Sequence, residues 1–559
     1  MTTLTRQAGL WLCAALLPLA SLAFGAERPK TACQLAVPCN RPAGAPKASD
    51  VIMRTLRFHP AGKKDAHDTL RAVRQFHVTR LEWAYVDNRE QIERIKTAGC
   101  LFGGAASAPS YYRQKKEPGW FEKVVIVNRL GEPIIAPWKR TWNRTLWGCI
   151  NNPELERGYV AYLKRYVDAG VQVMQRDEPG ANFLATRWGG CFCPHCMQGF
   201  RKYLAEKTTP QQRAELGIAD LEGFDYAKHL AKQNAPAGDA FGRWKGGRLK
   251  ELFVDFQTQA TIAFHRRTRK ALDAYAGRHV AVSCNNGVHR WGPIELEFDW
   301  AFGELSYGRA RPGVLYEALG EAARHGRIQV VTMPKKSNYD NPDQWQRRTR
   351  RSIATAYACG ALCMVPWDVY MPGDAPRYFG TPQQYADLFG FIRAAARYLD
   401  GYEQAAAVGK EIRPEKGDKS NLCEAPSGPL RGKLDLSPFS GRGAIAAIEG
   451  GSGEVLAVVR AKPGEPEAPV VVHLVDWGAE PKPLTLKLRS AGLFGARSVV
   501  AELFMPAPYE KRAHETAAQT RDYAALARSV KLPVAVEGDW TVAKIPALGP
   551  WGIVVVRPR

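Results

Sequence analysis

Between residues 51 and 371, short apolar segments alternate with longer amphipathic ones. Each apolar segment has the length and composition of a parallel strand that is buried on both faces. Eight such strands with helices between most of them predict a (β/α)8 TIM barrel with insertions over residues 51–405. A doubly wound open sheet is the alternative architecture. The strands are predicted at 51–60, 78–86, 100–107, 171–179, 279–287, 298–305, 327–335 and 361–371.

The pattern changes after residue 405. Gly, Pro and charged residues dominate 406–443, which predicts a linker or an irregular crossing. Strand-like segments then follow one another without long helices between them, and a single helical segment, 515–529, interrupts them. This pattern is typical of an all-β sandwich over residues 444–559. Its strands are predicted at 444–450, 454–461, 470–477, 484–490, 498–504, 541–546 and 551–558.

The N-terminus has the features of a secretory signal peptide. One arginine precedes an apolar stretch from about Ala8 to Phe24, and Ala23 and Gly25 occupy the −3 and −1 places before Ala26. Residues 1–25 are therefore predicted to be removed, and residues 26–50 form an N-terminal extension. No later stretch approaches 18 uncharged apolar residues, so we expect no membrane span and a periplasmic or secreted protein.

Lys and Arg outnumber Asp and Glu by 78 to 55, a net charge of +23 that is spread along the chain. A solvated basic surface explains this charge, and an acidic polysaccharide as partner is the sharper hypothesis. Export and the lack of the usual binding motifs argue against nucleic acid.

Acidic residues lie where a barrel of this kind binds its ligands, at the C-terminal ends of the strands. Asp177 and Glu178 end the fourth predicted strand, and Glu304 lies in the sixth. Cleavage of a glycosidic bond needs one carboxylic acid and a second carboxylate that acts as nucleophile or base. Because successive side chains of a strand alternate, at most one of Asp177 and Glu178 points into the mouth unless the strand bends there.

Each acidic residue also has a structural interpretation. The Asp177-Glu178-Pro179 triplet suits a turn, Glu304 suits a buried ion pair with an arginine, and Glu82 suits a structural role. Polar and aromatic side chains near the other strand ends are predicted to line the sugar site, because aromatic faces stack on sugar rings. These residues are Arg57, Glu82, Trp83, Asn285, Trp367, Asp368 and Tyr370.

Three cysteines, Cys191, Cys193 and Cys196, are too close in sequence to find separate disulfide partners easily, but they suit one tetrahedral metal. Cys149 is the expected fourth ligand, and His195 competes with it. Four protein ligands predict a structural zinc with no open position, and no organic cofactor is expected. Disulfides among the same thiols are the alternative, and Cys33 and Cys39 could form a separate pair.

The stretch 149–204, with Glu178 followed by CFCPHCMQGFRKYL, resembles the glycoside hydrolase family 42 β-galactosidases and related barrel hydrolases. The resemblance implies that Glu178 is the acid/base and that Cys149 joins the three later cysteines on zinc. Two positions depart from the family: Asp177 stands where it has Asn, and the segment 327–335 has no carboxylate for the nucleophile. Glu304 or Asp177 then remains for that role. The Asp177-Glu178 pair also resembles the substrate-assisted hexosaminidases, in which Asp orients an acetamido group.

The sequence thus predicts an exported glycoside hydrolase that cleaves an O-glycosidic bond of an oligo- or polysaccharide with a carboxylate pair. Two other hypotheses stay open. The first is a carbohydrate-binding barrel that has lost catalysis, which the missing carboxylate in 327–335 favours. The second is a lyase that acts on an acidic polysaccharide, which the net charge of +23 suits.

Overall fold

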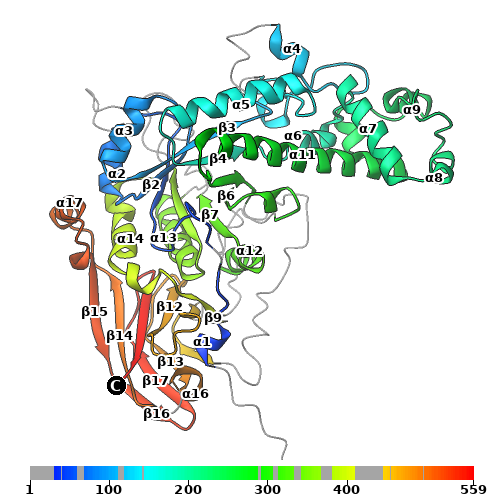
Figure 1. Cartoon of the computed structure of the whole chain (residues 1–559). Coiled ribbons are helices and arrows are strands. Elements are labelled where there is room, and N and C mark those ends of the chain that lie inside the picture. Colours follow the sequence, from blue (N-terminus) through cyan, green and yellow to red (C-terminus); the bar gives the residue numbers. More distant parts are fainter. Residues whose placement is uncertain are drawn as a thin grey trace, which may run out of the picture.

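Eight parallel strands close into a barrel in chain order, each bonded to the next and β8 to β1 (Figure 1). The structure is a computed structural model that describes residues 31–39, 41–59, 68–110, 119–141, 144–287, 291–305, 312–332, 341–366, 380–409, 445–452, 455–494 and 497–559. The predicted barrel is therefore confirmed, and a doubly wound sheet is excluded. The strands are β1 (Ile52–Arg54), β2 (Arg80–Ala84), β3 (Leu101–Ser107), β4 (Val173–Asp177), β5 (Val282–Asn285), β6 (Trp300–Glu304), β7 (Ile328–Thr332) and β8 (Leu362–Pro366).

Helices cover the outside of the barrel, and two of them begin with the same local signal. Asn152 and Asn341 each accept a hydrogen bond from a backbone N–H of the first turn, and a proline follows at the first helical position. The helices around the barrel are α2 (Thr69–Gln75), α3 (Arg89–Thr97), α5 (Pro153–Asp168), α12 (Pro312–Arg324), α13 (Pro342–Ala358) and α14 (Pro382–Ala394). The insertion between β3 and α5 holds α4 (Trp120–Val124) and the short η3 (Pro137–Lys139), and η5 (Glu295–Glu297) lies between β5 and β6.

Side-chain contacts define the inner and outer faces of the strands. Arg176 on β4 donates to Thr268 of the helix layer, so its neighbour Asp177 faces inward. On β3, a Cβ at Gly103 would meet Glu82 and Val173 inside the barrel, whereas one at Gly104 would meet an outer helix. Glycine at both positions lets β3 pack closely against the barrel interior on one face and against the outer helix on the other.

A long excursion after β4 forms an arm that projects from the barrel on the right of Figure 1. Its largest element is α11 (Gly247–Ala276), a helix of 30 residues that returns the chain to β5. An aromatic core that includes Phe192, Phe200 and Phe253 holds the arm together. The other elements of the arm are α6 (Ala181–Ala185), η4 (Thr186–Trp188), α7 (Pro194–Lys207), α8 (Pro210–Glu215), α9 (Tyr226–Lys232) and α10 (Asp239–Arg243).

Two antiparallel sheets form the C-terminal domain, one in the order β10-β13-β17-β16 and the other β15-β14-β18-β12-β11-β9, and their apolar faces share one core. The first strand, β9, spans the expected boundary at 405, because it pairs with β11. The segment 515–529 is only partly helical, because α17 (Lys511–Thr520) ends within it and β15 (Ala527–Leu532) begins within it. The strands are β9 (Glu403–Val408), β10 (Ala446–Gly450), β11 (Val455–Ala461), β12 (Val470–Asp476), β13 (Leu484–Arg489), β14 (Val499–Pro506), β15 (Ala527–Leu532), β16 (Val534–Glu537), β17 (Trp540–Ile545) and β18 (Gly552–Pro558). Two short helices, α1 (Ala32–Leu35) and α16 (Ser490–Phe494), pack against this domain.

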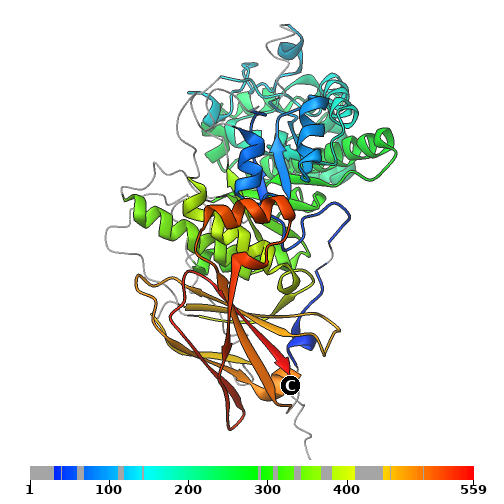
Figure 2. The same ribbon diagram turned by 90° about the vertical axis from the view of Figure 1, so that its left-hand side faces the viewer.

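The sandwich docks on the helices of the barrel, and helix α17 (Lys511–Thr520) reaches across to α2, as the two views show (Figures 1 and 2). Trp551 is buried between Tyr357 and Phe391 of the barrel helices. Beyond α2, His77 and His514 place Nε2 and Nδ1 2.7 Å apart in a buried contact. The two domains therefore share packed apolar and polar contacts.

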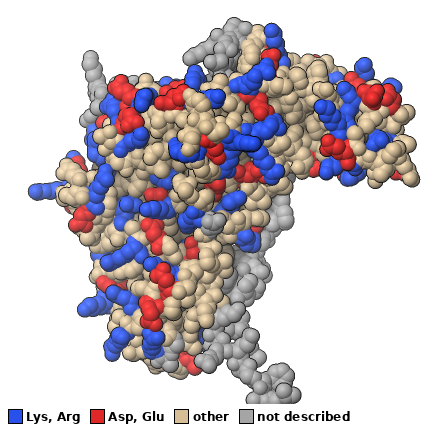
Figure 3. All heavy atoms as spheres, viewed as in Figure 1, with Lys and Arg blue, Asp and Glu red and all other residues tan. Residues whose placement is uncertain are grey.

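On the face shown in Figure 3, Lys and Arg are spread over the barrel, the arm and the sandwich, with Asp and Glu among them. In the described ranges, no helix combines the length and apolar content needed to cross a bilayer. Cys33 and Cys39 are both free, so the pair proposed from their proximity does not form: Cys33 packs on the core of the sandwich, whereas Cys39 lies beyond the end of α1. The predicted signal peptide lies outside the described residues.

Candidate functional site

Asp177 ends β4 at the C-terminal mouth of the barrel, and neutral donors from β5 and from the segment after β2 hold its carboxylate. The Tyr85 hydroxyl, just after β2, donates to Oδ2 at 2.6 Å. The side-chain amide of Asn285, at the end of β5, donates to Oδ1 at 3.2 Å. Two of the residues predicted from the sequence, Asp177 and Asn285, are therefore in direct contact.

Glu178 leaves the strand alternation because its backbone is left-handed, with φ of 56°. This conformation is uncommon for a residue other than glycine, and it turns the side chain away from β4. The Glu178 carboxylate accepts from Ser107 at 2.6 Å, from Ser110 and from Trp138 Nε1 at 3.2 Å. Lys139 Nζ lies 2.8 Å from Oε1, and the Glu178 side chain is 10% exposed. The bend brings both carboxylates of the pair to the mouth but surrounds Glu178 with donors.

Glu304, at the end of β6, also reaches the mouth, and its side chain is 43% exposed. Arg54 of β1 donates to its Oε1 at 3.3 Å, so the ion pair with an arginine that the sequence suggested is present, although Glu304 is not buried. The same guanidinium stacks 3.4 Å over the ring of Trp83. Trp83 lies at a bulge in β2, with φ of 54°, and is buried against Phe302. Arg54 thus separates Trp83 from the mouth.

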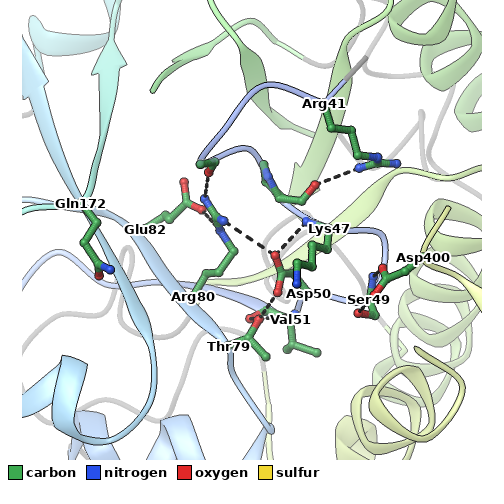
Figure 4. Close-up of polar contacts among 12 residues, drawn as sticks. Arg41, Lys47, Ser49, Asp50, Val51, Thr79, Arg80, Glu82, Gln172 and Asp400 are labelled. Carbon is green, nitrogen blue, oxygen red and sulfur yellow. Dashed lines mark hydrogen bonds and ion pairs between the residues drawn. The ribbon is translucent and has the colours of Figure 1, made fainter. Parts of the chain in front are cut away.

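Glu82 lies lower in the barrel, where Arg80 bonds to its Oε1 at 2.5 Å, as the close-up shows (Figure 4). The side chain is fully buried; burial raises the pKa of the Glu82 carboxyl, and the charge of Arg80 opposes this. Arg80 also donates to Gly44 O and lies 3.7 Å from Asp50. The structure thus places Glu82 in an ion-paired cluster at the base of the barrel.

The remaining predicted sugar-site residues are more distant or undescribed. Arg57 is exposed, three residues beyond the end of β1. Trp367, Asp368 and Tyr370 lie outside the described residues.

Four thiols, those of Cys149, Cys191, Cys193 and Cys196, meet in the arm, all buried and with their sulfur atoms within 4.8 Å of one another. The Sγ atoms of Cys149 and Cys196 are 3.5 Å apart, too far for a disulfide bond. A tetrahedral zinc with 2.3 Å bonds would separate its sulfur ligands by about 3.8 Å, so the cluster fits this metal. His195 is exposed and lies outside the cluster.

Two asparagine amides reinforce the fit to a metal. Asn151 donates to the sulfur of Cys196 at 3.2 Å, and Asn182 donates to that of Cys149 at 3.3 Å. Hydrogen bonds of this kind orient the thiolate ligands of a metal. The cluster joins the end of the β3–α5 insertion to the loop after η4, so it holds together the two segments that flank Glu178.

A polar stripe on α11, Gln257, Thr261, His265 and Thr268, fixes β4 and the turn after it. Gln257 accepts from Asn151 and Asn182, and Thr261 accepts from a backbone N–H of α6. His265 Nε2 lies 2.7 Å from Pro179 O, which requires a proton on Nε2. Burial lowers the pKa of His265 to about 3, so the ring is neutral near pH 7 and keeps this arrangement.

The sequence interpretation missed several residues of this site: Arg54, Tyr85, Ser107, Ser110, Trp138 and Lys139. Tyr85 and Ser107 were visible as polar residues at the ends of predicted strands. Trp138 and Lys139 belong to the insertion between β3 and α5, which has no periodic pattern that would place them. Their contact with Glu178 arises only from the tertiary fold.

The geometry can support acid–base or nucleophilic chemistry on a polar substrate. Neighbouring strands are about 4.8 Å apart, so β4 and β6, with β5 between them, lie about 10 Å apart. Inward side chains from these two strands can therefore lie on either side of one substrate bond. Asp177 and Glu304 occupy these two strands. The carboxylates in inverting and retaining glycosidases are about 5 to 9.5 Å apart, which this spacing allows.

No family model matches the chain. Among curated proteins, the α-agarase of Alteromonas agarilytica is 25% identical over 241 residues, and that of Thalassotalea agarivorans is 25% identical over 238 residues. Each alignment covers 40% of this chain but only 16% of the relative. This chain therefore matches a small part of the length of those enzymes.

Among solved structures, a cycloisomaltooligosaccharide glucanotransferase from Paenibacillus sp., complexed with cycloisomaltoheptaose, superimposes with a TM-score of 0.51. The alignment covers 91% of this chain and 85% of that protein, with 9% sequence identity. At this identity the likeness concerns the fold alone. The chain therefore shares with that protein the architecture of a (β/α)8 barrel followed by a C-terminal β-sandwich.

Proposed function

We propose that this chain is an exported glycoside hydrolase that cleaves an O-glycosidic bond of a polysaccharide. The observation that carries the proposal is the position of Asp177, an inward carboxylate at the end of β4 that Tyr85 and Asn285 orient. The similarity to α-agarases supports the class of reaction and suggests an agar-type galactan as substrate. Export rests on the segment 1–25, and an acidic galactan would suit the charge of +23.

The exposed and oriented carboxylates take the chemical roles in this proposal. Asp177 acts as nucleophile or base, because three donors, including the backbone N–H of Glu178, fix its oxygens. Glu304 is assigned the proton transfer to the leaving oxygen, because it ends β6 at the mouth and its side chain is 43% exposed there, within reach of a substrate. Glu178 positions the surrounding loop through Lys139 and Trp138, and its role as the acid/base, as in family 42, is the alternative.

Hydrolysis by the mature chain tests the proposal against agarose, a sulfated galactan, a β-galactoside and an N-acetylated glycan, with Asp177→Asn, Glu304→Gln and Glu178→Gln variants. We expect new reducing ends from one galactan and a loss of at least about 10³-fold in kcat for the first two variants. Glu537→Gln, an exposed carboxylate on β16, is the matched control.

The results separate the competing hypotheses. A comparable loss in Glu178→Gln with full activity in Glu304→Gln would transfer the acid role to Glu178. Unsaturated products that absorb in the ultraviolet would identify a lyase. Binding without cleavage, unchanged in all three variants, would leave a carbohydrate-binding barrel.

We further propose that Cys149, Cys191, Cys193 and Cys196 hold a structural zinc. Four buried sulfurs with amide donors support this assignment, and four protein ligands leave no position for substrate. Metal analysis of the purified chain is expected to give about one zinc per chain, whereas disulfides in a peptide map would contradict the proposal.

A further inference from the structure

Three tryptophans form a cluster beside Glu178. The rings of Trp138, Trp147 and Trp188 lie 5.1 to 5.6 Å apart between centroids, with interplanar angles of 79° to 88°. Trp147 and Trp188 are buried, whereas Trp138 is 46% exposed. The cluster therefore presents one indole to solvent and supports it with two that are enclosed.

The exposed indole is held in a defined orientation. Its Nε1 donates to Glu178 Oε1 at 3.2 Å, and the two buried rings contact it edge to face. It lies in η3, directly after Pro137, and the next residue, Lys139, is ion-paired with Glu178. A large apolar side chain fixed in this way needs little ordering when a ligand binds.

Other exposed apolar side chains lack these features. Leu130, on a turn of the same insertion, is 59% exposed, and Val536, on the edge strand β16, is 71% exposed. Neither has an aromatic support or a hydrogen bond to a carboxylate of the mouth among the described contacts. Trp138 thus combines exposure, rigidity and closeness to the candidate carboxylates.

We propose that Trp138 is the stacking platform of a sugar subsite, where its indole receives the apolar C–H face of a hexopyranose ring of the polysaccharide. This inference rests on the proposed function, since it assigns a subsite to the same mouth. The sugar ring would lie on the side of the mouth formed by η3 and the end of β3. Hydroxyl groups at the ring edge would remain free to meet Ser110, Glu178 or water.

Binding measurements test the platform without requiring hydrolysis. The probe is an agarose hexasaccharide, titrated by calorimetry into chains that carry Asp177→Asn, with Trp138→Ala, Trp138→Phe or Leu130→Ala added. We expect Trp138→Ala to weaken binding about tenfold or more, as for other aromatic stacking sites. Trp138→Phe keeps a ring but loses the bond to Glu178, so it should weaken binding no more than about threefold, and Leu130→Ala should not change it.

Kinetics in the otherwise unchanged chain give a second readout. A stacking role predicts that Trp138→Phe retains most of kcat and KM, whereas Trp138→Ala raises KM more than it lowers kcat. Equal losses in Trp138→Ala and Trp138→Phe would show that the bond to Glu178 matters rather than stacking, and would overturn the platform. Hexasaccharide affinity that stays within twofold in Trp138→Ala, or no binding to the parent chain, would overturn it as well.

The same experiment keeps the two proposals apart. Weaker binding in Trp138→Ala together with no hydrolysis of any glycan would support the platform and reject the hydrolase. Hydrolysis that depends on Asp177, together with unchanged binding in Trp138→Ala, would support the hydrolase and reject the platform.

Discussion

Asp177 and Glu82 are both inward-facing carboxylates on barrel strands, but they lie in opposite halves of the barrel. Glu82 is fully buried against the guanidinium of Arg80, within a cluster that also includes Asp50 and Thr79 (Figure 4). Asp177 is partly buried at the mouth, and its side-chain partners Tyr85 and Asn285 are neutral. The two carboxylates therefore lie in different electrostatic settings within one barrel.

The two settings suit different purposes: that of Glu82 suits stability, and that of Asp177 suits chemistry. A buried carboxylate whose charge a neighbouring arginine compensates cannot take part in a reaction without leaving that arginine unpaired. A carboxylate oriented by neutral donors keeps its charge available to a substrate. Barrels of this kind place function at the C-terminal ends of the strands and stability at the other end. The sandwich contacts the barrel through α17 and His77 near the N-terminal ends of the strands, so these contacts also belong to the half of the barrel that provides stability.

The largest effect is expected from Glu82→Gln. The change removes the closer of the two carboxylates that pair with the buried Arg80 and leaves only Asp50, 3.7 Å away, which should lower the free energy of unfolding by about 3 kcal/mol. The kcat of the folded fraction should stay within about threefold of the parent value. Urea unfolding and initial rates measure the two quantities, and Asp177→Asn is the counterpart, with a large loss of rate at nearly unchanged stability. A fall in the kcat of the folded Glu82→Gln chain to well below a third of the parent value would show that Glu82 contributes to catalysis as well as to stability.

A smaller effect concerns acid and the contact between His77 and His514. Burial lowers the pKa of His77 to about 3, and the positive charge of Arg393 adds to this shift. Burial also lowers the pKa of His514, although the carboxylates of Asp387 and Glu510 oppose that shift. Below pH 6.5 the unfolded chain therefore binds protons that the folded chain does not, and stability is lost as the pH falls from about 6.5 towards 3. One such group contributes about 1.4 kcal/mol per pH unit over this window.

Urea unfolding of the parent chain and of His77→Gln at pH 7.5, 5.5 and 4.5 measures this contribution. The variant should show a shallower loss between pH 5.5 and 4.5, by about 1.4 kcal/mol per pH unit. The buried rings of His265 and His473 add to the pH dependence of stability in both chains, so the contribution of His77 is read from the difference between the two pH profiles. His195→Gln, at an exposed position, is the control. Parallel pH profiles would show that folding does not lower the pKa of His77.

The smallest effect is expected from Tyr85→Phe at the mouth. The change removes the 2.6 Å hydrogen bond to Asp177, which should lower kcat about tenfold and leave the free energy of unfolding within about 1 kcal/mol. Tyr275→Phe removes a similar bond, 2.8 Å to Asp168 on the outer helices, and should leave kcat unchanged. Equal rates in the two variants would indicate that the orientation of Asp177 does not limit the reaction.

The repeating part of the fold was predictable, because each buried strand has its own apolar segment. The failures lie where local pattern and tertiary context disagree. The segment 515–529 reads as helical, yet Ala527–Leu532 pairs with β14 and forms a strand. Strand alternation predicts that Asp177 and Glu178 face apart, and nothing in the local sequence indicates the left-handed backbone that turns Glu178. The grouping of Cys191, Cys193 and Cys196 followed from their spacing, and Cys149 was added from its place just before the helix that leads to the fourth strand. Trp138 and Lys139, by contrast, meet Glu178 through contacts distant in sequence.

Helix α11 limits where the arm can change in length. Gln257, Thr261, His265 and Thr268 recur at intervals of three or four residues, so they share one face of the helix. Because each residue adds about 100° of rotation, a single insertion or deletion between Gln257 and Thr268 would turn one end of this stripe away from its partners. A change before Gln257 would leave these contacts in register. Related chains should therefore differ in length at the tip of the arm and keep the number of residues between Gln257 and Thr268 constant.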